Sequence, residues 1–124
     1  MPHTRVEYDE GVAAAFDRRA FAKDLHETLV AVVGGRAEGC KTRFLPLADT
    51  YIADGSDGYA MVHVEIGILG GRTPERKREL SEAVIALLRK HIAPVPEVEL
   101  QTSVDVRDLD REAYVREDRP RGAR

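Results

Sequence analysis

The chain begins with Met1 and Pro2, and these two residues indicate a specific kind of chemistry more clearly than any others in the sequence. Initiator methionine is usually removed before a small residue such as proline, and its removal leaves a secondary amine held in a ring. An α-amino group titrates near ~8, and burial or nearby cations lower that pKa toward neutrality. Such an amine can take a proton from one atom and return it to another near pH 7. We therefore predict that Pro2 is a catalytic residue.

Three cationic side chains are candidates for binding an anionic substrate near such an amine. Lys41 and Arg43 lie two residues apart, so in an extended segment they project from the same face. Arg72 follows two glycines in a loop that leads into a helix, and a helix start with free N–H groups suits a carboxylate or phosphate. The further cations at positions 76–78 are expected mainly to solvate that helix. Lys41, Arg43 and Arg72 are thus the candidate substrate-binding residues, and for Arg72 the residues alone leave binding and solvation both open.

Alternation of apolar and polar residues predicts four strands that position these groups. The expected strands cover residues 2–8, 40–47, 59–69 and 98–106. Pro46 lacks an N–H donor, so the end of its strand is expected at an edge of the sheet or at a bulge. In the strand over 59–69, Met61, His63 and Glu65 share one face, and this mixed surface predicts association with other copies of the chain.

Two helices are expected between the strands. The first begins after Asp17 as N-cap and ends at Gly34, and the second begins at Thr73 and stops before Pro94. The order strand, helix, strand therefore occurs twice, and right-handed crossovers place both helices on one face of the sheet. The sequence predicts an α+β fold with a four-stranded mixed sheet. One domain is expected over residues 1–109, followed by a charged tail over 110–124 that is loose or partner-dependent.

Composition argues against several other classes of protein. A net charge of -3 over 124 residues gives no global basic field for nucleic acid. No apolar run approaches the ~20 residues of a membrane-spanning helix, and the first residues lack the apolar core of a signal peptide. The lone Cys40 has no partner for an internal disulfide. We expect a cytoplasmic protein without a nucleic-acid or membrane partner.

Histidine and cysteine offer weaker prospects for chemistry. The four histidines are His3, His26, His63 and His91, and none pairs with Cys40 or a carboxylate at metal-ligand spacing. No metal site is therefore expected. His63 is expected on a sheet face, where it is interpreted as a packing residue. Cys40 is interpreted as a small buried residue.

Several short segments, taken together, carry a family resemblance. They are Met1-Pro2-His3, Ala53-Asp54-Gly55 leading to Tyr59-Ala60, Val62-His63, and Gly71-Arg72 before a helix. In their joint spacing the chain resembles the 5-carboxymethyl-2-hydroxymuconate isomerase family of the tautomerase superfamily, whose members share an amino-terminal proline. The resemblance runs from Pro2 to about Val106 and is strongest between Ala53 and Arg72.

The resemblance implies a homotrimer with sites near subunit boundaries and no cofactor. It implies isomerisation of 5-carboxymethyl-2-hydroxymuconate during homoprotocatechuate (aromatic) catabolism, with Pro2 moving the proton. Arg43 and Arg72 match family arginines that hold substrate carboxylates. Lys41 occupies a neighbouring arginine position, and lysine keeps the charge but loses the planar bidentate fork, which leaves the substrate open.

Two alternatives remain. The first is a tautomerase for a different keto acid or unsaturated acid. The second is a trimeric binding or structural module that keeps the scaffold without catalysis. Retention of Met1 would favour the second, because the nitrogen of Pro2 is then an amide without a basic lone pair.

Overall fold

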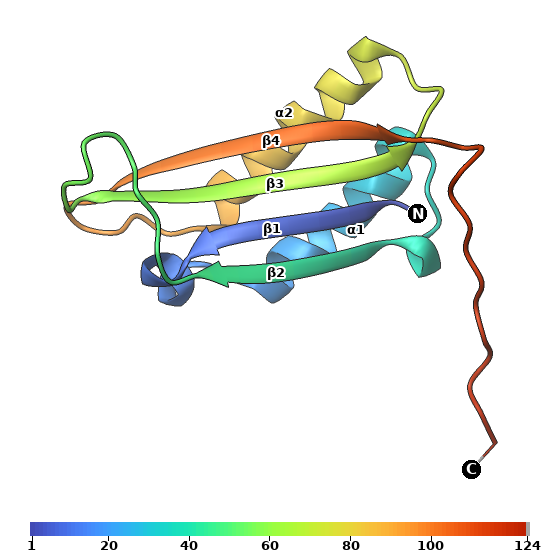
Figure 1. Cartoon of the computed structure of the whole chain (residues 1–124), viewed down its shortest axis with the longest axis horizontal. Coiled ribbons are helices and arrows are strands. Elements are labelled where there is room, and N and C mark those ends of the chain that lie inside the picture. Colours follow the sequence, from blue (N-terminus) through green and yellow to red (C-terminus); the bar gives the residue numbers. More distant parts are fainter. Residues whose placement is uncertain (124) are drawn as a thin grey trace.

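The computed structural model describes residues 1–123, and Arg124 lies outside the described residues. Four strands form one mixed sheet in the order β2-β1-β3-β4. They are β1 (His3–Asp9), β2 (Lys41–Leu47), β3 (Tyr59–Leu69) and β4 (Glu99–Leu109). The pairs β1–β2 and β3–β4 are parallel, and β1–β3 is antiparallel. Both helices, α1 (Arg18–Val33) and α2 (Pro74–His91), lie on the same side of the sheet (Figure 1), which confirms the predicted fold.

The helices begin and end where the sequence predicts. The side chain of Asp17 accepts a hydrogen bond from the N–H of Ala20 at 3.1 Å, and Thr73 caps α2 in the same way. Gly34 follows α1 with φ 73°, a left-handed conformation that glycine adopts without steric cost. These caps fix the two loops that approach Pro2, the one after α1 and the one before α2.

The core lies between the two helices and one face of the sheet. Side chains from β1, β3, α1 and α2 meet there, each at most 1% exposed: Val6, Phe21, Leu25, Leu29, Val62, Val64, Ile66, Leu80, Val84 and Leu88. Burial of this apolar surface is the main force holding both helices to the sheet. Strand β2 is at the sheet edge, so the expectation from Pro46 is confirmed.

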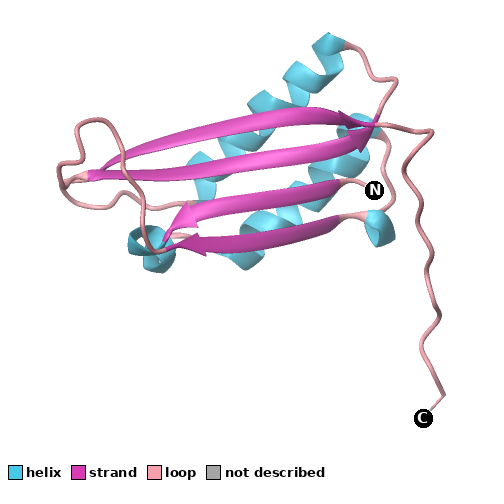
Figure 2. Cartoon of the chain, in the orientation of Figure 1, coloured by secondary structure: helices cyan, strands magenta, loops and turns pink. Residues whose placement is uncertain are grey.

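Two short 3-10 helices, η1 (Glu10–Ala15) and η2 (Ala37–Gly39), are absent from the sequence-based expectation. They appear in Figure 2 as short coils beside the two ends of the sheet. β4 also extends to Leu109, beyond the expected end at residue 106, because its register with β3 continues to the pair Leu69–Leu109. Asp108 accepts from Lys77 of α2 at 3.3 Å. Within residues 1–123, no helix has both the length and the apolar character that crossing a membrane requires.

The other face of the sheet carries polar groups that bond across strands. Nδ1 of His63 on β3 lies 2.6 Å from Oγ of Ser103 on β4, and Nε of Arg107 lies 3.5 Å from Oε2 of Glu65. On β3 the predicted alternation is confirmed, since Val62 and Val64 are fully buried while His63 and Glu65 are partly exposed on the opposite face.

Candidate active site

Pro2 is buried at the end of the sheet where β1 begins. Its carbonyl oxygen accepts the N–H of Lys41 at 3.1 Å, which fixes it to the start of β2. Together with Met1, it lines a cavity of about 30 Å³ whose other walls are Val33, Gly35, Ile68, Leu69 and Arg72. Four segments of the chain therefore meet around this residue, and sheet pairing holds it in place.

Gly35 allows the loop after α1 to approach Pro2 closely. A Cβ at position 35 would lie 3.2 Å from Cδ of Pro2. Because few real Cβ contacts are that short, any larger side chain would push on the proline ring. The glycine pair that ends α1 thus also shapes the wall of the cavity.

Arg72 reaches the same cavity from the loop between β3 and α2. Its Nη1 donates to the carbonyl oxygen of Leu69 at 2.8 Å, and its Nη2 donates to that of Val33 at 2.7 Å. Val33 is the last residue of α1, so the guanidinium compensates the partial negative charge at that helix end. Both bonds fix its orientation, and the remaining N–H groups stay available to an anion.

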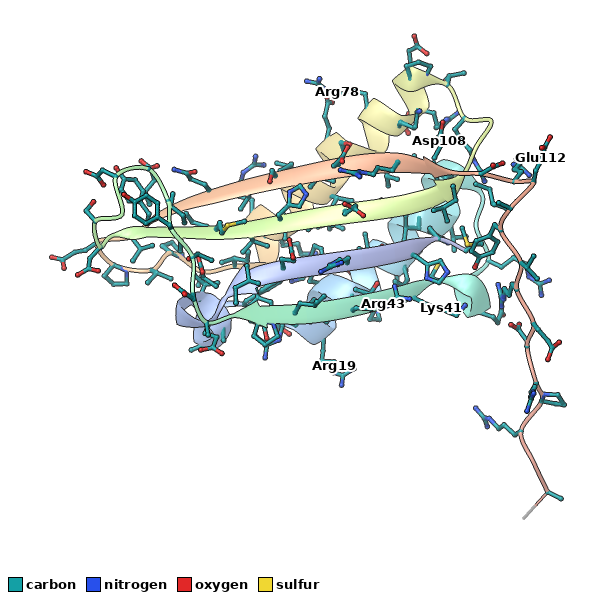
Figure 3. The ribbon with its side chains drawn as sticks, in the orientation of Figure 1. Arg19, Lys41, Arg43, Arg78, Asp108 and Glu112 are labelled. Carbon is teal, nitrogen blue, oxygen red and sulfur yellow. The ribbon has the colours of Figure 1, made fainter. Side chains whose placement is uncertain are left out.

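Lys41 and Arg43 start β2, and the register pairs Lys41 with His3 and Arg43 with Arg5. Figure 3 shows both at the end of β2 where the chain begins. Nζ of Lys41 donates to the carbonyl oxygen of Gly39 at 3.3 Å, and Nη2 of Arg43 lies 3.1 Å from Nδ1 of His3. The structure thus places both residues close to the chain start.

The segment after β4 also reaches this end of the sheet (Figure 1). The hydroxyl of Tyr114 lies 2.8 Å from Nε2 of His3. A Cβ at Gly39 would lie 3.0 Å from Nη1 of Arg116, so that glycine makes room for the guanidinium. Sequence reasoning missed His3, Tyr114 and Arg116 as site residues. His3 was visible within the first motif, whereas the charged tail gave no signal.

The charges at this end change how nearby groups titrate. The amine of the described chain belongs to Met1, and its pKa is lowered by burial, then by Lys41 and Arg116. The pKa of His3 is lowered by burial, then by Arg43 and Lys41. A base placed here is therefore kept neutral more readily than in solvent.

None of the three predicted cations has a carboxylate partner in the part of the chain that the structure describes. Within residues 1–123, ion pairs involve neither Lys41 nor Arg43 nor Arg72. Arg116 differs, since its guanidinium makes two bonds to the Asp118 carboxylate at 2.8 and 2.6 Å. The site therefore has an excess of positive charge that suits an anionic ligand.

Other side chains considered from the sequence have structural partners. Cys40 is buried, and burial raises the pKa of its thiol, which disfavours a nucleophilic thiolate. The cations of the α2 start pair with carboxylates, Arg76 with Glu79 and Arg78 with Glu82.

The chain is similar to known isomerases over most of its length. The family model of 5-carboxymethyl-2-hydroxymuconate isomerase matches residues 2–119. The chain is 28% identical over 100 residues to the 5-carboxymethyl-2-hydroxymuconate Delta-isomerase of Escherichia coli, covering 81% of this chain and 79% of that protein.

Two solved structures show the same fold. The 5-carboxymethyl-2-hydroxymuconate isomerase of Deinococcus radiodurans R1 superimposes with a TM-score of 0.83 at 24% identity, covering 95% of this chain and 90% of that chain. A fused 4-OT wild type symmetric trimer superimposes with a TM-score of 0.71 at 22% identity, covering 89% and 87%.

The two βαβ units in one mixed sheet are the fold of the tautomerase superfamily, and the protein is an isomerase. Within that superfamily the chain belongs to the 5-carboxymethyl-2-hydroxymuconate isomerase family, as the resemblance in its short segments predicted.

Proposed function

We propose that the protein isomerises an anionic 2-hydroxydienoate of the 5-carboxymethyl-2-hydroxymuconate type, using the amine of Pro2 after removal of Met1. The observation that carries the proposal is the cluster of unpaired cations around the buried start of β1. Arg72 lines the cavity with Pro2, the N–H of Lys41 donates to the carbonyl oxygen of Pro2, and Arg43 contacts the next residue, His3. The pKa of the Met1 amine is lowered at this end of the sheet, and the same burial and the charge of Lys41 would act on an amine at Pro2. We further propose that the reaction belongs to homoprotocatechuate catabolism in the cytoplasm.

The proposed reaction is a proton transfer that leaves the composition of the substrate unchanged. The neutral secondary amine accepts a proton from the dienol, and the electron pair left behind delocalises through the conjugated chain. The ring ammonium then returns the proton to a different atom and yields the unsaturated ketone. The same nitrogen serves first as base and then as acid, so the step needs no cofactor.

The cations have separate parts in this mechanism. Arg72, oriented by its bonds to Leu69 and Val33, binds a carboxylate beside the cavity and stabilises charge on the substrate oxygen. Arg43 and Lys41 bind a second carboxylate from the β2 side. Lys41 provides a point charge without the planar fork of arginine, which leaves room for acids other than the one in the family name.

Intact mass and a mutation test the role of Pro2. The purified protein is expected to lack one methionine. The variant Pro2→Ala replaces the secondary ring amine with a primary amine, and we expect it to lower kcat by roughly 10²-fold. Circular dichroism and molar mass in solution are expected to remain those of the wild type. Unchanged turnover in Pro2→Ala would remove this residue from the mechanism.

We keep a second candidate, a non-catalytic binding module. It requires that Met1 is retained, because the amino group of Met1 would then bond to the carbonyl oxygen of Gly39 and the nitrogen of Pro2 would be an amide without a basic lone pair. A mass that includes Met1, together with no turnover of any 2-hydroxydienoate, would support the module and contradict the enzyme.

We propose a homotrimer as the working assembly. The uncovered sheet face offers polar groups from β3 and β4, and this trimer would cover that face while placing the sites near subunit boundaries. Light scattering after size-exclusion chromatography is expected to give three chain masses at micromolar concentration. A monomeric mass would contradict the proposal.

A further inference from the structure

Three side chains form a hydrogen-bonded chain from the sheet edge to the segment after β4. Nη2 of Arg43 lies 3.1 Å from Nδ1 of His3, and Nε2 of His3 lies 2.8 Å from the hydroxyl oxygen of Tyr114. The rings of His3 and Tyr114 also meet edge to face, with centroids 5.8 Å apart. The middle member, His3, is the residue that follows Pro2.

The chemistry of arginine fixes the direction of both hydrogen bonds. A guanidinium only donates, so Nδ1 of His3 must accept and carries no hydrogen. The hydrogen of a neutral imidazole then resides on Nε2, which donates to the oxygen of Tyr114. The proton of the Tyr114 hydroxyl is consequently left free to donate to another group.

The surroundings keep His3 in the form that this direction requires. Burial, followed by the charges of Arg43 and Lys41, lowers its pKa. The other charged groups facing this ring are the chain amine and the Arg116 guanidinium, and both act in the same direction. A protonated His3 would carry hydrogen on both nitrogens and lose the bond from Arg43.

The segment that carries Tyr114 is anchored at this place. The N–H of Tyr114 donates to the carbonyl oxygen of Asp110 at 2.9 Å, and Nε of Arg111 donates to that of Gly70, two residues before Arg72. Tyr114 is partly buried, and within residues 1–123 its hydroxyl bonds only to His3. A phenol with a free proton thus lies among unpaired cations.

We infer that Tyr114 donates its hydroxyl proton to a carboxylate oxygen of the anionic substrate, and that His3 is a positioning residue that holds this hydroxyl through its bond to Arg43. The inference rests on the proposed function for the identity of the ligand as a dicarboxylate. It assigns the segment after β4 to the substrate site rather than to a loose tail. It also explains how Arg43 affects binding beyond its own charge.

The first test compares Tyr114→Phe with Tyr51→Phe. Both remove one hydroxyl, but Tyr51 is 80% exposed and bonds to Asp54 in the loop before β3. Because a hydrogen bond to a charged group is lost, Tyr114→Phe is expected to lower kcat/KM for the dienoate about tenfold, whereas Tyr51→Phe keeps the wild-type value. Wild-type kcat/KM in Tyr114→Phe would overturn the inference.

Calorimetry with glutarate, a non-reactive dicarboxylate, separates this inference from the proposed function. Tyr114→Phe is expected to weaken glutarate binding about tenfold, and Tyr51→Phe is expected to leave it within about twofold of the wild type. An enzyme that turns over the dienoate through Pro2, yet binds glutarate equally with and without the Tyr114 hydroxyl, would defeat the inference alone. A protein that binds glutarate through Tyr114 but turns over no dienoate would defeat the proposed function alone.

Two measurements test the positioning role of His3. Nitrogen-15 NMR is expected to show Nδ1 without hydrogen and Nε2 with it, and the opposite tautomer would overturn the assigned direction. If His3 acts through Tyr114, the double variant His3→Phe/Tyr114→Phe is expected to lose no more glutarate affinity than the worse single variant. Additive losses would show that His3 does not act through Tyr114.

Discussion

The protein has two clusters of positive side chains, and they differ in their partners. At the start of α2, Arg76, Lys77 and Arg78 each lie within ion-pair distance of a carboxylate. At the start of β1, Lys41 and Arg72 donate to backbone carbonyl oxygens. Carboxylates neutralise the charges of the first cluster, whereas the charges of the second cluster remain available to an anionic ligand.

The sequence assigned positions 76–78 mainly to solvation of the helix and favoured Lys41, Arg43 and Arg72 for binding, and the ion pairs of the α2 cluster give a physical reason for that difference. The α2 cluster is dense and adjoins a helix start, while the residues of the second come from separate segments of the chain. The two clusters differ in whether each cation has a carboxylate partner. Exposed ion pairs contribute little to stability, and their charges are already compensated. A cation without a carboxylate partner beside a cavity attracts an anion.

Replacing one arginine from each cluster should give the largest contrast. Arg72→Ala is expected to lower kcat/KM for a dicarboxylate dienoate by roughly 10²-fold, because charge-assisted bonds to substrate are lost. Arg76→Ala, which breaks an exposed pair at 3.5 Å from Glu79, is expected to change kcat/KM by less than about twofold. Steady-state kinetics on both variants measures the contrast.

A neutral substrate analogue provides the control for Arg72. Its turnover should fall much less than that of the dianion, and an equal loss on both would contradict carboxylate binding. Chemical denaturation should show a separate cost of roughly 1–3 kcal/mol, since the carbonyl oxygens of Leu69 and Val33 lose their donor.

A smaller effect is expected from moving Pro2 without removing any charge. In Gly35→Ala the new Cβ would lie 3.2 Å from Cδ of Pro2, so the ring must shift by a few tenths of an ångström. Such a displacement of a reacting group is expected to lower kcat roughly tenfold. Gly11→Ala is the matched control, because a Cβ there meets nothing within 4 Å. Equal kcat values for the two variants would show that the position of the ring is not limiting.

The fold was predictable because local and global signals agree. The caps at Asp17 and Thr73 and the alternation of β3 each specify one element, and parallel crossovers leave few topologies open. The end of β4 was not predictable in the same way. Its last residues are charged and break the apolar pattern, and Asp108 belongs to the sheet through its pairing with Ile68 of β3, with Lys77 of α2 beside it.

The site was predictable in part. The spacing of Lys41 and Arg43 on one strand indicated a shared face, and the structure brings both near Pro2. The contribution of the segment after β4 was not predictable, because Tyr114 reaches His3 across 111 positions in the sequence. A charge-rich tail carries no periodicity that would reveal such a contact.

The smallest predicted effect distinguishes two histidines whose pKa values are lowered for different reasons. Burial lowers the pKa of His26, whose Nε2 lies 2.8 Å from Oγ1 of Thr42. The pKa of His3 is lowered by burial and also by the positive charges of Arg43 and Lys41. Because salt screens exposed charges, raising sodium chloride from 0.05 to 0.5 M is expected to raise the pKa of His3 by a fraction of a unit and leave that of His26 unchanged. Proton NMR titration of the two rings measures both, and equal shifts would mean that the cations do not act on His3.

The lowered pKa values of these two histidines predict that the folded protein becomes less stable as the pH falls. Both histidines have folded pKa values below the ordinary value of 6.5, so both favour the folded state in their neutral form. Their contribution to the free energy of unfolding is full above pH 6.5 and is lost as the pH falls through the folded values. Urea denaturation at pH 7.5 and at lower pH should therefore show a loss on acidification that His26→Gln reduces. The salt dependence should remain in that variant, because it arises at His3 among the unpaired cations.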